Sequence, residues 1–120
     1  MRAESIEKFI KTLVEVYGDG VRVAREGQQT LVRVCEVELY PTCQPPVTPM
    51  LLVFDTGQPK PQVYVQPGQL LANGRAPKSS STVLVGGESW LQFSFNIPWN
   101  EEDGIMRFLI AARQRFTQNE

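Results

Sequence analysis

Hydrophobic residues near the start of the chain recur at helical spacing. Apolar side chains follow one another at intervals of three and four residues, at Ile6, Phe9, Ile10, Leu13, Val14 and Tyr17. That spacing puts them on one face of an α-helix, and Gly18-Asp19-Gly20 ends the pattern. Ser5 is the expected N-terminal cap. The sequence therefore predicts an amphipathic helix as its first element.

Short runs rich in valine and other apolar residues come next and predict strands. They occupy residues 21–24, 31–40, 50–54 and 63–65. A polar turn at residues 26–29 separates the first two runs, which is typical of a hairpin. Residues 41–49 contain four of the nine prolines and must form a connection. We therefore expect an antiparallel meander of about four strands.

Turn residues dominate the segment that follows the meander. Pro67-Gly68 and Asn73-Gly74 are strong turn signals, and little periodicity is present from residue 66 to 77. Residues 82–85 are compatible with a further strand, which Gly86-Gly87 would end. Residues 90–95 alternate as a strand or an extended packing segment would. We expect this region to be a long irregular loop ahead of the last helix.

A second amphipathic helix is predicted near the end of the chain. Its apolar positions again have helical spacing, at Ile105, Phe108, Leu109, Ala112 and Phe116. Asn100 is the expected cap, and the acidic residues 101–103 would occupy the first turn, where the helix dipole favours them. The whole chain, residues 1–120, is thus predicted to be a single α+β domain whose helices cover one face of the meander.

Charge and hydropathy exclude several classes of partner. Twelve basic and thirteen acidic side chains give a net charge of -1, and the basic residues are scattered. Nucleic-acid binding and anionic-membrane binding both need clustered lysine and arginine, so we expect neither partner. No run of about 18 apolar residues exists, and charges interrupt the N-terminal segment. We therefore expect a cytoplasmic protein.

The inventory of reactive side chains is small. Cys35 and Cys43 are the only cysteines, and the chain has no histidine. Catalysis by a histidine acid–base and four-ligand zinc sites built on cysteine and histidine are thereby excluded. We expect no metal and no cofactor. Cys35 is interpreted as a small core residue, whereas the role of Cys43, in the proline-rich connection, stays open.

Four short motifs follow one another in an unusual order. They are PKPQVYV at 59–65, NGRAP at 73–77, GGESWLQFSF at 86–95 and PWNEEDG at 98–104. In this order they resemble ubiquitin-conjugating enzymes, and most closely the divergent bacterial relatives of that fold. The resemblance implies an N-terminal helix, a four-stranded meander, a proline turn, an active-site loop and a tryptophan before the next helix. The motifs cover residues 59–108, while the layout covers the whole chain.

The chain departs from this family at the catalytic position. The enzymes carry a cysteine a few residues after their conserved asparagine, whereas this sequence has serine and threonine at residues 79–82. A hydroxyl would need a base to become a nucleophile, and no histidine is available to activate it. The resemblance therefore implies an inactive relative that binds a ubiquitin-like protein or its activating enzyme within a bacterial ubiquitin-like modification system.

The resemblance singles out Asn73, Gly74, Trp90 and Trp99 as candidate protein-binding residues. Asn73-Gly74 is also explained by a turn that needs positive φ, and both tryptophans by core packing. Two other functions remain open at this point. One is an active conjugating enzyme that uses Cys43 as a displaced nucleophile, and the other is a dimeric protein resembling secretion chaperones.

Overall fold

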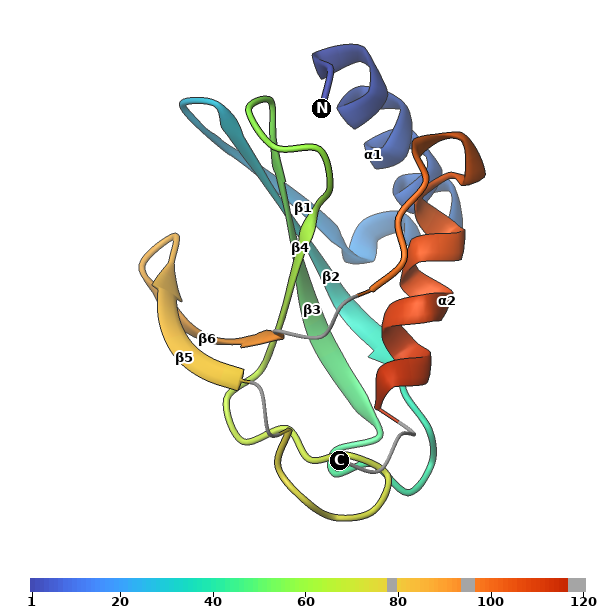
Figure 1. Ribbon diagram of the computed structural model, residues 1–120, viewed down its shortest axis with the longest axis vertical. Helices are drawn as coiled ribbons and strands as arrows, with labels where there is room; N and C mark the ends of the chain where they lie inside the picture. Colours follow the sequence, from blue (N-terminus) through green and yellow to red (C-terminus); the bar gives the residue numbers. More distant parts are fainter. Residues whose placement is uncertain (78–79, 94–96, 117–120) are drawn as a thin grey trace.

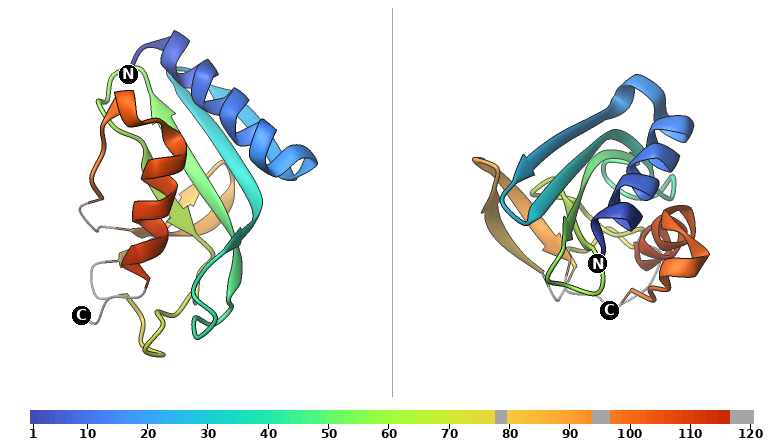
Figure 2. Two further views of the ribbon diagram at one scale, coloured as in Figure 1. Left: turned by 90° about the vertical axis from the view of Figure 1, so that its right-hand side faces the viewer. Right: turned by 90° about the horizontal axis from the view of Figure 1, so that it is seen from above.

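Six antiparallel strands form one sheet, and both α-helices lie on the same face of it (Figure 1, Figure 2). The computed structural model describes residues 1–77, 80–93 and 97–116. The strands are β1 (Val21–Glu26), β2 (Gln29–Glu38), β3 (Val47–Asp55), β4 (Gln62–Val65), β5 (Ser80–Val85) and β6 (Glu88–Phe93). The helices are α1 (Ala3–Tyr17) and α2 (Ile105–Arg115), with short 3₁₀ turns η1 (Gly18–Gly20) and η2 (Glu101–Asp103). The predicted α+β class with a helix at each end is confirmed.

The order of the strands is β1-β2-β3-β4-β6-β5. Strands β1 to β4 are neighbours in sequence and in space, so the predicted four-stranded meander is present. Residues that face each other across two antiparallel strands lie on the same side of the sheet. Val32 of β2 therefore shares a face with Leu52 of β3, and Leu31 shares the other face with Val53.

The larger core fills the space between the sheet and the two helices. Phe9 and Leu13 of α1 are buried there, and the ring of Phe9 stacks on that of Phe54 with the centroids 6.2 Å apart. Leu109 of α2 is buried against the same face of the sheet. The apolar face predicted for α2 is the face that packs, and so is that of α1 except at Val14, which was predicted to lie on this face but is 45 % exposed.

The predicted long irregular loop is wrong for residues 80–93, which form the β5–β6 hairpin. Its two-residue turn has positive φ at Gly86 (60°) and Gly87 (83°), as the type I′ turn favoured in hairpins requires. The strand suggested at residues 82–85 and its end at Gly86-Gly87 are confirmed, and residues 90–93 form a strand, one of the two alternatives left open. The expected extension of the last strand to residue 95 lies outside the described residues.

The hairpin bends across the face of the sheet that the helices leave open (Figure 1). Among the described residues, two pairs join β6 to β4, Tyr64 with Gln92 and Val65 with Leu91, and both lie away from the turn of the hairpin. The half of the hairpin near the turn covers a second, smaller core of Leu31, Leu51, Val53, Tyr64 and Trp90. The sheet is therefore covered on both faces.

Both helix starts differ from prediction. The carbonyl of Arg2 accepts the first helical bonds of α1 from the amides of Ser5 (3.1 Å) and Ile6 (3.2 Å), so Ser5 is not a cap but a buried helical residue. The side chain of Asn100 does cap, but it caps η2, by accepting from the amide of Glu102 at 3.0 Å. Gly104, with φ of 83°, then separates η2 from α2.

Within residues 1–77, 80–93 and 97–116, no helix combines the length and the apolar character needed to cross a bilayer.

A pair of adjacent substitutions on α1 tests this packing. Leu13 is fully buried, whereas Val14 is 45 % exposed. Leu13→Ala should lower the free energy of unfolding by about 2–5 kcal/mol because it leaves a cavity under the helix. Val14→Ala should change it by no more than about 0.5 kcal/mol. Urea unfolding followed by circular dichroism measures both, and equal effects would contradict this placement of the helix.

Candidate functional site

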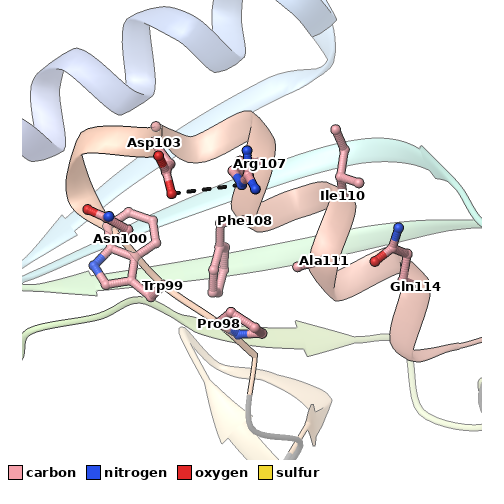
Figure 3. A pocket seen from close by; sticks show the side chains of 10 residues that line it. Pro98, Trp99, Asn100, Asp103, Arg107, Phe108, Ile110, Ala111 and Gln114 are labelled. Carbon is pink, nitrogen blue, oxygen red and sulfur yellow. Dashed lines mark ion pairs between the residues drawn. The ribbon is translucent and has the colours of Figure 1, made fainter.

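A cleft of about 430 Å³ runs along the outer side of α2 (Figure 3). One wall comes from residues 98–100, which lead into η2, and the other from the solvent-facing side of the helix. The lining residues are Pro98, Trp99, Asn100, Asp103, Gly104, Arg107, Phe108, Ile110, Ala111 and Gln114. The buried Phe108 and the partly buried Trp99 form its base and its rim is mostly polar, an arrangement typical of sites that bind protein.

Trp99 is held firmly at one end of this cleft. Its ring meets Phe9 of α1 edge-on, with the centroids 5.3 Å apart, and Phe108 of α2 in the same way at 5.2 Å. Edge-to-face contacts of this kind add to the stabilisation from burial alone. Trp99 is only partly buried, so it joins the two helices and still offers surface to the cleft.

The rim carries one ion pair and one exposed apolar side chain. The Nε atom of Arg107, in α2, lies 3.8 Å from Oδ2 of Asp103, the last residue of η2, and both side chains are solvated. Ile110, one turn further along α2, is 49 % exposed. Ile110 lines the same cleft as Trp99 and Phe108, and apolar side chains grouped in a cleft are a feature that a partner surface would cover.

The described residues that line the cleft offer groups for binding. None of their side chains carries a thiol, hydroxyl, amine or imidazole. The one carboxylate among them, on Asp103, is engaged by Arg107. Among the residues that the structure describes, no three cysteine, aspartate or glutamate side chains gather as a metal site would require.

The structure does not bring the four predicted protein-binding residues together. Trp99 lines the α2 cleft, whereas Trp90 lies in the smaller core on the opposite face of the sheet and is 4 % exposed. The guanidinium of Arg33 sits 5.3 Å from the Trp90 ring centre, and the same arginine pairs with Glu88 of the hairpin at 3.2 Å. Trp90 therefore has a packing role.

Asn73 and Gly74 form a tight turn near the end of α2. The side-chain oxygen of Asn73 accepts from the amide of Arg75 at 2.9 Å, and the Gly74 amide donates to the Leu71 carbonyl at 2.9 Å. Gly74 has φ of 81°, a conformation that glycine adopts without steric cost. The predicted turn with positive φ is thus present at Gly74, and local bonds account for both residues.

Cys43 does approach this turn, but it is buried. Its thiol donates to the carbonyl of Phe116 at 3.9 Å, and the same carbonyl accepts from the amide of Ala72 at 2.7 Å. Burial raises the pKa of the Cys43 thiol above its ordinary value of 9.0, although a backbone hydrogen bond with Tyr40 acts the other way. With 1 % exposure and a raised pKa, this sulfur is neither accessible nor activated.

Sequence reasoning missed Ile110 and Arg107. Ile110 falls outside the apolar stripe of α2, and an isoleucine on the polar side of a helix was the available signal. Arg107 follows Asp103 by four residues, the spacing of an ion pair on a helix surface. Neither signal distinguishes a binding site from ordinary solvent-facing positions without the neighbouring Trp99.

A scan against protein-family models found no match, and searches of the curated proteins and of the solved structures found no match either.

Alkaline pH should destabilise the fold through Cys43. The pKa of the Cys43 thiol is higher in the folded chain than in the unfolded chain, so the unfolded chain loses the thiol proton first as the pH rises. The stability that the protonated Cys43 gives the fold is therefore full below pH 9.0 and is lost as the pH rises through the folded pKa. The free energy of unfolding should fall between about pH 8 and about pH 10.5, and the fall should be smaller in Cys43→Ala than in Cys35→Ala.

Some of this fall should remain in Cys43→Ala, because burial also raises the pKa of the Tyr64 hydroxyl above 10.0. Urea unfolding at the two pH values provides the measurement. An identical pH dependence in the two cysteine variants would contradict the buried position of Cys43.

Proposed function

We propose that this chain is a noncatalytic protein-binding module with a ubiquitin-conjugating-like fold, and that the α2 cleft is its binding site. The partner we propose is a ubiquitin-like protein or the enzyme that activates it, within a bacterial ubiquitin-like modification system. The observation that carries the proposal is the cleft itself: an anchored tryptophan and an exposed isoleucine, with no nucleophile among its lining residues.

The order of the elements supports the ubiquitin-conjugating-like part of the proposal. A helix, a four-stranded meander, a turn region, a tryptophan and a further helix follow one another along the chain, with the β5–β6 hairpin inserted before the tryptophan at residue 99. The motifs PKPQVYV and PWNEEDG fall at the end of the meander and directly before α2, as the resemblance implies.

The position of the hairpin supports the noncatalytic part. Residues 80–82, which stand where the family's nucleophile is expected, belong to β5 and pair with β6. Their backbone is therefore fixed in a regular strand. The chain has no histidine that could activate their hydroxyls.

The chemistry of the cleft favours a folded protein surface as the ligand. Trp99 and Phe108 are set by their mutual edge-on contact before any partner arrives, so little side-chain entropy is lost on binding. Aromatic anchors of this kind, with solvated charges at the rim, are typical of binding hot spots. Arg107 and Asp103 would then select partners by charge.

A charge placed in the cleft should weaken binding. Ile110→Glu should weaken binding of the partner by about tenfold or more, because a carboxylate would have to be desolvated against an apolar base. The matched control is Val14→Glu, at a residue of similar exposure (45 %, against 49 % for Ile110) on the other helix. Nuclear magnetic resonance titration with the ubiquitin-like protein and the activating enzyme of the same organism measures the affinity.

Binding that survives Ile110→Glu would exclude the α2 cleft as the binding site. No binding of either candidate by the unaltered chain would overturn the proposed partners.

A thioester trap tests the absence of catalysis. Incubation with the activating enzyme, ATP and the ubiquitin-like protein should give no adduct on this chain that a reducing agent cleaves, because the Cys43 thiol is buried. An adduct that appears with the unaltered chain and disappears in Cys43→Ser would instead establish a displaced nucleophile. Cys35→Ser is the control for the other thiol.

A further inference from the structure

The two edges of the sheet differ in chemistry. β1 forms one edge and carries Arg22, Arg25 and Glu26, and Arg25 also pairs with Glu7 of α1 at 2.7 Å. Charges on an edge strand oppose pairing with another chain. β5 forms the other edge, with the sequence SSTVLV. It carries no charge and no proline, and its pairing with β6 is free of bulges.

The hairpin register determines which backbone groups of β5 face outward. Val85 and Glu88 flank the two-residue turn, and in such a hairpin the flanking residues exchange hydrogen bonds with each other. Bonded and non-bonded pairs alternate along an antiparallel ladder. Val83 is therefore bonded to β6, whereas the amide and carbonyl groups of Thr82 and Leu84 point to the open edge.

This open edge is both exposed and well supported. In the described part of the chain, no backbone bond outside the β5–β6 ladder reaches residues 80–85. Leu84 is 76 % exposed, the largest value among the exposed large hydrophobic residues described. Val83 and Val85 pack against the smaller core, which fixes the strand from its other side. Figure 1 shows β5 on the side of the molecule away from both helices.

We propose that β5 pairs antiparallel with β5 of a second copy of this chain, so that two six-stranded sheets become one. A two-fold axis perpendicular to the sheet at Thr82 sets Leu84 opposite Ser80 of the other copy. In that register the outward groups of Ser80, Thr82 and Leu84 are all bonded.

A second copy fits this edge because the strand is complementary to itself. A strand that pairs with this edge must be extended and uncharged, and its outward backbone amide and carbonyl groups must repeat every two residues. β5 has each of these properties. No charges oppose each other across the proposed axis, and each copy satisfies the open edge of the other. A single pair of short strands buries an area at the low end for protein interfaces, so association is weak and depends on concentration.

Sedimentation equilibrium tests this association at chain concentrations from about 10 µM to about 1 mM, a range suited to weak interfaces. The unaltered chain should shift from monomer to dimer. Thr82→Lys should weaken the dimer by about tenfold or more, because it brings two like charges together at the axis. Ser89→Lys is the matched control: Ser89 pairs with Leu84 on the same face, one strand further in, and should leave the dimer nearly unchanged.

Amide hydrogen exchange, read residue by residue, tests the register even if Thr82→Lys disturbs the hairpin. In the unaltered chain, the amides of Thr82 and Leu84 should become more protected as concentration rises. The amide of Val83, already bonded to β6, should not change. A chain that stays monomeric throughout, or a dimer in which the Thr82 and Leu84 amides gain no protection, would overturn the proposal.

Discussion

Strand β3 is apolar on both of its faces, and the rest of the structure follows from the need to cover them. Met50, Leu52 and Phe54 point towards the helices, and Leu51 and Val53 point the other way. A strand of this composition is stable only in a sheet that is shielded on each side. The helices α1 and α2 provide one cover. The β5–β6 hairpin, which returns across the opposite face and is tied to it by the Arg33–Glu88 pair, provides the other.

This two-sided cover explains where the candidate site lies. The inner sides of both helices are used up in the larger core, and the far face of the sheet is occupied by the hairpin. The outer sides of the helices stay open, and it is beside α2, on the segment that leads into it, that Trp99 reaches from the core to the surface. The same arrangement accounts for the buried position of Cys43, since its loop is packed against the end of α2.

The helices and the meander could be predicted because their hydrophobic periods are regular and their turns carry glycine or proline. The pairing of residues 80–93 as a hairpin could not, because short apolar runs fit either a strand or an extended segment and do not reveal their partner strand. The conformation of Gly86-Gly87 appears only in the structure. Periodicity also cannot tell which side of a sheet a tryptophan occupies, so Trp90 and Trp99 looked equivalent although they lie on opposite faces. The burial of Cys43 depends on contacts more than 70 residues away along the chain, beyond the reach of any local pattern.

The division of α2 into two sides has a consequence for how this protein can diverge. Ile105, Leu109 and Ala112 belong to the core, so changes there are selected against through stability. Arg107, Ile110 and Gln114 are exposed, and replacing them costs the fold little. The lining of the α2 cleft can therefore change quickly on a constant scaffold. Phe108 is the exception, because it is buried and also lines the cleft. A change at Phe108 would therefore alter both the stability of the core and the shape of the cleft.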